Sequence, residues 1–329
     1  MNTNRYYFSD KVSKPMQFKS MELLDAWDFQ SDAKSIYIEP LEGGLNNVNL
    51  VLNNGSDKWV LKIRPPDFEL FGAAPESSLR AQRDAAYLGI APKVIAIHES
   101  EWHFISEYIV GDTLRPEFTR RNDLYAEVIQ TLHILHGGHC SCREFSIFDD
   151  IRLFMKGVDS ANIDCPPRFR ELLASAYKLE NELNNTRAPK GFCHNDLVPQ
   201  NFIKCADGIR LVDFDYAGVG WIAADLASAT SQFEMTEDEV ETFLLLYDAG
   251  LDDGQRGRLA ALRFCNNIRE VSYTLFAEPL LSNTTATLDD LSYTTHREFN
   301  LEQAQRACSD PAFNDKCKAA TSVRQDALF

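Results

Sequence analysis

The stretch from residue 193 to residue 216 gathers side chains that can take part in proton transfer and metal binding. It opens with CHNDLVPQN, in which Asp196 and Asn201 stand five residues apart. It closes with LVDFDY, where an apolar strand pattern ends in two carboxylates, Asp213 and Asp215. Because alternate residues of a strand point to opposite faces, these carboxylates would share one face while their apolar neighbours enter the core.

The oxygen atoms of these side chains suit the transfer of a phosphoryl group. An Asn amide oxygen and an aspartate are hard ligands of the kind that Mg²⁺ prefers, and Mg²⁺ also holds phosphate oxygens. Asp196 needs no metal, because a carboxylate placed against a substrate hydroxyl could accept the proton as that hydroxyl attacks phosphorus. The competing interpretation is a loop of hydrogen-bonding residues between two core strands.

The elements that must position these residues differ between two parts of the chain. A short amphipathic helix is expected around residues 18–31, and alternation in IYIEPL, NVNLVL and WVLKI predicts three strands after it. A helix from about Pro75 to Leu88 and two further strands within residues 89–114 complete this β-rich part.

From about Arg121 the apolar periodicity becomes helical. Helices are predicted within residues 123–138, 145–158, 167–185, 225–233, 236–250 and 254–281, with two short strands near residues 201–215. The sequence therefore predicts an α+β protein with a β-rich lobe in residues 1–108 and a mainly helical lobe in residues 109–329. The residues from about Asn300 form a polar tail to which no role is assigned.

Composition excludes several classes of partner. The formal net charge of −16 disfavours nucleic acid, whose binding depends on clustered Lys and Arg, and it suits a cationic small molecule. No apolar run approaches the roughly 20 residues that span a bilayer, and the first residues lack an apolar signal core. The expected location is the cytoplasm, with no membrane partner.

The eight cysteines show no framework spacing and are expected to be free thiols. One local cluster, His136, His139, Cys140 and Cys142 in HGGHCSC, would allow a zinc site. That interpretation is the weaker one, since two glycines indicate a helix end and no second ligand pair is evident.

The motifs HNDLVPQN and VDFDY, in that order, resemble the His-x-Asp-x-x-x-x-Asn and Asp-Phe-x signature of protein-kinase-like phosphotransferases. The second motif ends in Asp where protein kinases use Gly, and no APE-like segment follows. In this respect the chain is similar to the aminoglycoside phosphotransferase and choline kinase family, which phosphorylates small molecules. The resemblance implies a two-lobed protein-kinase-like α+β fold with a small β-rich N-lobe and a larger, mainly helical C-lobe.

The resemblance also implies a reaction, the direct transfer of the γ-phosphoryl group of ATP to a hydroxyl with Mg²⁺ as cofactor. Asp196 would be the catalytic base. The metal ligands would be Asn201, Asp213 and, with less support from the family pattern, Asp215. The structural residues would be His194, which orients the loop, and Asp225, which ties the next helix to it.

The nucleotide site implied by the resemblance lies mostly in the N-lobe. Its residues would be Gly43, Gly44, Asn46, Asn47, Lys62, Glu107, Tyr108 and Ile109. The glycine pair would let the backbone approach the phosphates, and Lys62 would steady the α- and β-phosphates. The family pattern also expects a helix Glu paired with Lys62. This sequence has Ser78 at that position, so Glu76, two residues earlier, is the candidate partner.

The acceptor implied by the resemblance is choline or a related cationic amino alcohol. The substrate residues would be Tyr216, Glu270, Tyr273, Tyr293 and Arg297. Choline kinases usually carry two tryptophans where Glu270 and Tyr273 stand, so this pocket would be more acidic and less aromatic. A primary amine also fits, because a carboxylate can accept its N–H bonds.

Other functions stay open at this point. An aminoglycoside phosphotransferase is the first alternative, and a thiamine, homoserine or sugar kinase is the next. A nucleotide-binding pseudokinase, which keeps the fold without turnover, is the alternative outside enzymes.

Overall fold

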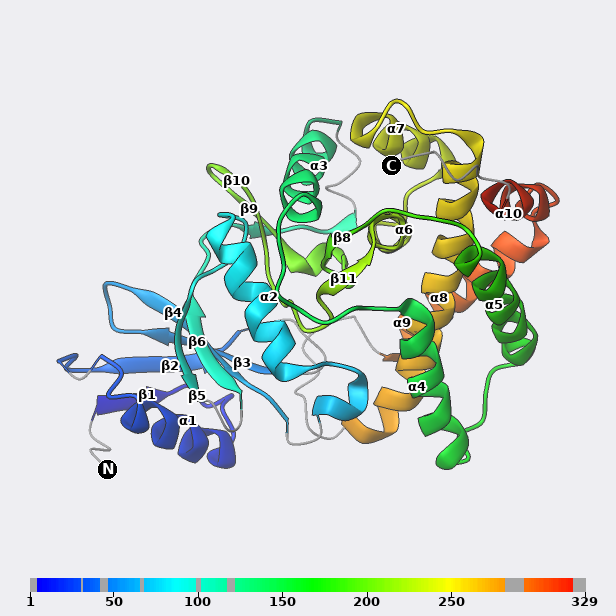
Figure 1. Cartoon of the computed structure of the whole chain (residues 1–329). Helices are drawn as coiled ribbons and strands as arrows, with labels where there is room; N and C mark the ends of the chain where they lie inside the picture. Colours follow the sequence, from blue (N-terminus) through cyan, green and yellow to red (C-terminus); the bar gives the residue numbers. More distant parts are fainter. Residues whose placement is uncertain are drawn as a thin grey trace.

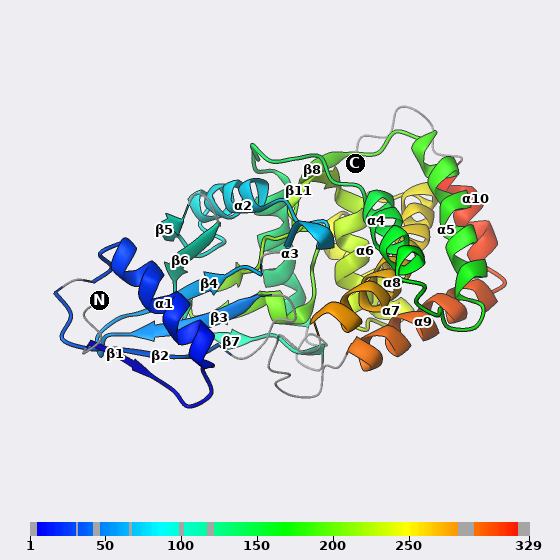
Figure 2. The same cartoon turned by 90° about the horizontal axis from the view of Figure 1, so that it is seen from below.

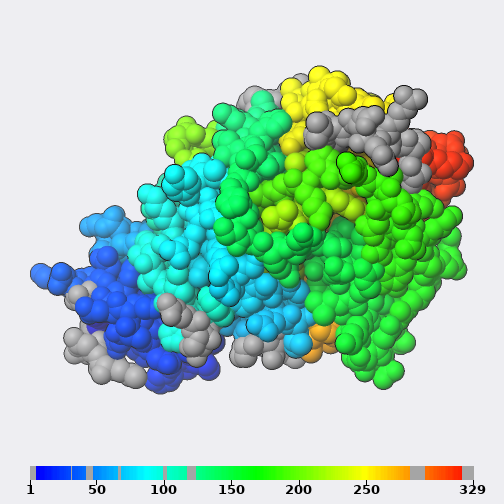
Figure 3. All heavy atoms as spheres, viewed as in Figure 1, coloured from blue at the N-terminus to red at the C-terminus, as the bar shows by residue number. Residues whose placement is uncertain are grey.

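The chain folds into two lobes of unequal size (Figure 1). The computed structural model describes residues 5–30, 32–41, 47–65, 68–98, 102–116, 122–281 and 293–321. In the space-filling view the blue-to-cyan N-terminal part fills one end of the molecule, and the green-to-red remainder fills the other (Figure 3). The predicted α+β fold with a β-rich N-lobe and a helical C-lobe is confirmed.

A six-stranded sheet forms the N-lobe. In spatial order its strands are β1 (Tyr6–Phe8), β2 (Ile36–Pro40), β3 (Val48–Asn53), β4 (Lys58–Ile63), β6 (His103–Glu107) and β5 (Val94–His98). Neighbouring strands are antiparallel except β1, which runs parallel to β2. Sequence alternation predicted five of these strands. It missed β1 because three residues are too few to show a period of two.

The two faces of this sheet have different roles. Helix α1 (Lys14–Ala26) lies across one face (Figure 2), where Leu23 and Leu24 pack with Leu61 and Ile63 of β4. Strand alternation turns the intervening Lys62 to the opposite face, toward the C-lobe. Helix α2 (Pro75–Tyr87) lies between β4 and β5 in the chain and at the junction of the lobes (Figure 1). Its bounds agree with the predicted range within one residue.

The C-lobe is built around one long helix, α8 (Asp253–Leu281), which packs against α4, α6, α9 and α10. The helices of this lobe are α3 (Asn122–His136), α4 (Ile147–Ser160), α5 (Phe169–Asn184), α6 (Ile222–Gln232), α7 (Glu237–Tyr247), α8, α9 (Tyr293–Ser309) and α10 (Phe313–Thr321). Leu262, Cys265 and Ile268 of α8 are fully buried. The main core of the lobe is therefore centred on α8, and a smaller cluster that includes Tyr216, Tyr273 and Tyr293 forms a second one.

Two small sheets carry the loops on which the sequence motifs lie. One pairs β8 (Lys190–Cys193) with β11 (Gly218–Trp221), and the other has the order β10 (Gly208–Leu211), β9 (Phe202–Cys205) and β7 (Asp112–Thr113). The chain passes from the large sheet to this lobe between Glu107 and Asp112, the segment in which the predicted division after residue 108 falls. Only β9 and β10 were predicted. Of the others, β7 has two residues, and β8 and β11 have four each, which is too few to show a clear period of two.

The polar tail expected from about Asn300 is wrong for the residues described, which continue as α9 and then form α10. Ala304, Phe313, Cys317 and Ala320 are buried there, and α10 packs on α8. Small apolar residues at helical spacing suffice to seat these helices, although their overall composition is polar.

The expectation of eight free thiols is wrong for one pair. Cys140 and Cys142 form a disulfide, and the other six cysteines are free. His136 of the same segment hydrogen-bonds Tyr247 and Asp225, so the zinc interpretation of HGGHCSC finds no support. Within the described ranges, no helix combines the length and the apolar character needed to cross a bilayer.

The packing of α10 against α8 depends on Gly257 of α8. A Cβ at this position would clash with the backbone oxygen of Lys316 in α10. We therefore expect Gly257→Ala to lower the free energy of unfolding by about 1–3 kcal/mol, measured by denaturant titration. Ala260→Ser, at a half-buried position of α8, is the control and should change it by less than about 0.5 kcal/mol. Equal stability of Gly257→Ala and wild type would contradict the close approach of the two helices.

Candidate active site

A cavity of about 510 Å³ has walls from both lobes. Asp196, Asn201 and Asp213 all line it, so the structure brings together the three residues that the motifs single out. The other predicted site residues on its wall are Lys62, Glu107, Tyr108, Ile109, Tyr216, Glu270 and Tyr273. Gly43, Gly44 and Asn46 lie outside the described residues.

The loop that carries Asp196 is held in a strained form by one buried carboxylate. Asn195 and Asp213 have positive φ angles of 63° and 65°, a region that costs a non-glycine residue about 1–2 kcal/mol. The backbone N–H groups of His194 and Asn195 donate to the two oxygens of Asp225, at 2.9 and 2.7 Å. These bonds tie α6 to the loop and offset the strain.

Further hydrogen bonds lock this loop to the second motif. The backbone N–H of Val212 donates to the carbonyl of Asn201 at 3.0 Å, and His194 Nε2 donates to the carbonyl of Val212 at 3.0 Å. His194 is fully buried, and burial lowers the pKa of its imidazole. A neutral, buried ring of this kind orients the loop, and His194 is not one of the residues that line the cavity.

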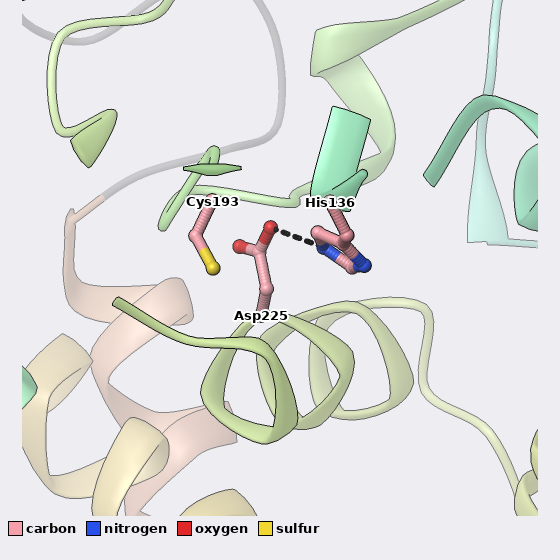
Figure 4. Close-up of side chains that lie close together, drawn as sticks. All are labelled: His136, Cys193 and Asp225. Atoms are coloured by element: carbon pink, nitrogen blue, oxygen red, sulfur yellow. Dashed lines mark hydrogen bonds and ion pairs between the residues drawn. The ribbon is translucent and has the colours of Figure 1, made fainter. Parts of the chain in front are cut away.

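His136 and Cys193 lie next to Asp225 and form a buried cluster with it (Figure 4). His136 hydrogen-bonds Asp225 at 3.0 Å and the hydroxyl of Tyr247 at 2.8 Å. Burial raises the pKa of Cys193 well above its ordinary value, and its thiol donates to the backbone oxygen of Gly220 at 3.5 Å. The cluster has satisfied partners and serves to join α3, β8 and α6.

Asn201 is oriented by Asp196. Its amide nitrogen donates to the backbone oxygen of Asp196 at 2.8 Å and to the carboxylate at 3.1 Å. The amide oxygen is consequently the atom of Asn201 left for a cation. Burial, together with the charge of Glu270, raises the pKa of Asp196 to about 8.

A buried ion cluster joins the N-lobe to the second motif. Lys62 Nζ lies 2.8 Å from Asp213 Oδ1 and 2.9 Å from Asp215 Oδ1. Asp215 also lies 3.3 Å from the guanidinium of Arg64 and accepts a hydrogen bond of 2.7 Å from Asn47. Although burial opposes its charge, Lys62 and Arg64 hold the pKa of Asp215 well below its usual range.

The contacts of this ion cluster differ from two expectations, one for Glu76 and one for Asp215. Glu76 does not pair with Lys62, since it is exposed and forms an ion pair with Arg80 one turn along α2. Ser78 instead donates to the backbone oxygen of Asp215 at 2.9 Å. Both oxygens of Asp215 already contact protein donors, and this residue is not on the described cavity wall. The counter-ion of Lys62 thus comes from the DFD motif and not from the helix.

The C-lobe wall of the cavity contains residues that sequence reasoning missed. They are Gln232, Glu234, Arg269, Thr295, His296 and Phe299. The helical pattern gave no indication of them, because which face of α8 and α9 meets the cavity depends on how the helices are rotated. The sequence did signal the unusual lysine partner, through Ser78 in α2 and Asp215 in DFD.

Two predicted substrate residues lie elsewhere. Tyr293 is buried, with its ring 6.5 Å from that of Tyr273. Arg297 lines a second cavity with Leu275 and pairs with Glu278 at 2.5 Å, so its placement in the acceptor pocket is wrong. Its side chain points about 100° around the axis of α9 from that of His296, which lines the first cavity.

Comparison with known proteins agrees with this geometry. A model of the phosphotransferase enzyme family matches residues 38–262. The chain belongs to this family. Protein LicA of Haemophilus influenzae is 25% identical over 238 residues, which cover 69% of this chain and 69% of that protein. Ethanolamine kinase 2 of Rattus norvegicus is 26% identical over 159 residues, covering 44% of this chain and 39% of the relative.

The fold is similar to a solved kinase over nearly its full length. The crystal structure of choline kinase LicA from Streptococcus pneumoniae has a TM-score of 0.72 at 18% identity, and the match covers 89% of this chain and 100% of that one. The predicted resemblance to the aminoglycoside phosphotransferase and choline kinase family is confirmed, and the protein is a phosphotransferase.

The role of Asp215 can be tested by stability. We expect Asp215→Asn to lower the free energy of unfolding by about 3–5 kcal/mol, because Lys62 and Arg64 stay buried while their shared counter-ion is lost. Denaturant titration measures the change. Glu76→Gln, which removes only an exposed partner of Arg80, is the control and should cost less than about 0.5 kcal/mol.

A double variant tests whether a carboxylate on α2 can replace that of Asp215 as the counter-ion of Lys62. Adding Ser78→Glu to Asp215→Asn supplies a carboxylate from α2, where related phosphotransferases are expected to carry it. The double variant should recover part of the lost stability. If it is no more stable than Asp215→Asn alone, the exchange of counter-ion between helix and motif would be refuted.

Proposed function

We propose that the protein transfers the γ-phosphoryl group of ATP, with Mg²⁺, to the hydroxyl of a small cationic amino alcohol of the choline and ethanolamine type. The observation that carries this proposal is the convergence of Asp196, Asn201 and Asp213 on one cavity with Lys62 opposite them. A proton acceptor, two cation ligands and a phosphate-binding cation are the parts that phosphoryl transfer needs.

The nucleotide would occupy the N-lobe end of the cavity. Val60, Phe104 and Ser106 line that end with apolar and small surfaces, and Glu107, Tyr108 and Ile109 follow along its edge. Strand β6 ends at Glu107, so the backbone of the next two residues lies beyond the sheet and can meet adenine. Lys62 would release part of its contact with Asp213 to bind phosphate oxygens.

Magnesium fits the donors that remain at the centre of the cavity. Asn201 and Asp213 would hold it, since the amide nitrogen of Asn201 faces Asp196 and its oxygen faces away. The ion would neutralise phosphate charge. We assign Asp215 to Lys62 and Arg64 and not to the metal, because its oxygens are already paired with protein donors.

Asp196 would act on the acceptor. Its carboxylate accepts the hydroxyl proton, the hydroxyl oxygen bonds to the γ-phosphorus, and the bond from that phosphorus to the bridging oxygen breaks. The Asn201 amide holds the carboxylate in place for this step. Positioning and charge neutralisation supply most of the acceleration in such a transfer, so no phospho-enzyme is required.

Two considerations support an amino alcohol as the acceptor. The family relatives include proteins named choline kinase and ethanolamine kinase. A cavity of about 510 Å³ that must hold nucleotide and acceptor together also favours a small molecule over an aminoglycoside.

The direct test is ADP release across a panel of acceptors, with choline, ethanolamine, thiamine, homoserine and kanamycin. We expect turnover that needs Mg²⁺ and an amino alcohol. Asp196→Asn should lower kcat by roughly 100-fold or more while nucleotide affinity, measured by titration calorimetry, stays within about twofold. Asp207→Asn, at an exposed turn of the C-lobe, is the control for charge removal.

Two results would count against this function. Tight nucleotide binding without ADP release for any acceptor would indicate a pseudokinase. Wild-type kcat in Asp196→Asn would remove the base from its assigned position.

The pH dependence offers a separate check. The base must be ionised, so kcat/KM falls as the pH drops through the pKa of Asp196. The charge of Glu270 helps to raise this pKa, and Glu270→Gln should therefore move the acidic limb of the profile to lower pH. The limb is measured at saturating Mg²⁺ and ATP for both proteins. An unmoved limb would show that another group titrates there.

A further inference from the structure

The aromatic surface at the acceptor end is occupied from within the protein. A quaternary ammonium is held in proteins by the faces of aromatic rings. Here the guanidinium carbon of Arg269 lies 4.5 Å from the ring centroid of Tyr216. Both side chains are buried, at 3% and 5% exposure. The cation–π position over Tyr216 is thus filled by an internal cation.

Arg269 is fixed in this position by two carboxylates. Its Nε donates to Asp150 at 2.9 Å and its Nη1 donates to Glu270 at 2.8 Å. Asp150 is buried as well, at 5% exposure. Moving Arg269 away would leave a buried carboxylate without its partner, which costs several kcal/mol (about 3–5). Arg269 therefore does not make room for a ligand cation.

The second tyrosine at this end is also engaged. Tyr273 is 8% exposed and packs edge-on against Phe154, with ring centroids 5.5 Å apart. Among the described residues, the other rings on this part of the wall are Phe299 and the imidazole of His296, and His296 is hydrogen-bonded to Glu270 at 3.0 Å. Phe299 is then the ring left for a trimethylammonium group, and a single ring does not enclose one.

Hydrogen-bond acceptors replace the missing aromatic faces. Glu270 accepts from Arg269 at Oε1 and from His296 Nε2 at Oε2, at 2.8 and 3.0 Å. Each carboxylate oxygen can accept about two hydrogen bonds, so each retains a site for a donor in the cavity. Although burial opposes the charge, His296 and Arg269 hold the pKa of Glu270 below its usual value. Asp150 and Glu270 both pair with the one guanidinium of Arg269, and this excess of carboxylates favours a further cation.

We propose that the acceptor carries an ammonium group with N–H donors, which bind Glu270, and that a quaternary ammonium is a poor substrate. This inference rests on the proposed function and narrows it to primary, secondary or tertiary amino alcohols. Glu270 acts as the specificity residue, and Arg269 excludes the trimethylammonium group by covering Tyr216.

A methylation series tests the proposal. The four acceptors are ethanolamine, its N-methyl and N,N-dimethyl derivatives, and choline, each with Mg²⁺ and ATP. We expect kcat/KM for ethanolamine to exceed that for choline by roughly tenfold or more, the size of effect that a charged hydrogen bond supplies. The steepest fall should come at the last methylation, which removes the last N–H.

Variants connect the selectivity to its residues. Glu270→Gln should lower kcat/KM for ethanolamine by roughly tenfold, mainly through KM, and change the value for choline by less than about twofold. Glu298→Gln, an exposed position of α9 outside the cavity, is the matched control and should leave both unchanged. Arg269→Met combined with Asp150→Asn removes the internal cation with its partner. This pair should shift the ratio of the two acceptors toward choline by roughly tenfold.

Each outcome has a distinct meaning. If choline equals or exceeds ethanolamine, the inference is overturned while the proposed function stands. If no member of the series is phosphorylated, the proposed function fails and the inference with it. Preference for ethanolamine that survives in Glu270→Gln would overturn the assignment of selectivity to this residue. Melting temperatures of all variants show whether each is folded.

Discussion

A single buried lysine connects the two lobes. Lys62 leaves the N-lobe sheet and meets two carboxylates of the C-lobe, Asp213 at 2.8 Å and Asp215 at 2.9 Å. A buried ammonium needs such partners, because an unpaired charge in the interior costs several kcal/mol (about 3–5). The width of the cleft at its centre is therefore constrained by this contact. Arg64 and Asn47 add further N-lobe contacts to Asp215.

Asp213 and Asp215 differ in role because their surroundings differ. Asp215 is enclosed and paired, whereas the side chain of Asp213 keeps 27% exposure and lines the cavity. One carboxylate thus maintains the lysine and the other remains available for a cation. Since Ser78 of α2 offers no carboxylate to Lys62, the DFD motif supplies the counter-ion here.

The loop that carries Asp196 is also held by buried polar contacts. Asp225 accepts two backbone N–H groups next to a residue of positive φ, and His194 joins that loop to the second motif. Asp196, Asn201 and Asp213, for which we propose the roles of base and cation ligands, are held in place by these contacts, which would remove ordering cost from the reaction. The acceptor end is built differently, from an internal cation and its carboxylates.

Local sequence determined what could be read from spacing and periodicity. Asp196 and Asn201 lie within one turn of chain, and Asp213 ends the adjacent hairpin, so their convergence followed from a short segment. The alternation around Lys62 fixed the face of β4 that carries it. Only the tertiary structure decided which partners meet across large separations. Lys62 and Asp215 are 153 residues apart, and Arg269 covers Tyr216 while Arg297 faces another cavity. Such pairings depend on how helices are rotated and docked, and no local pattern encodes that rotation.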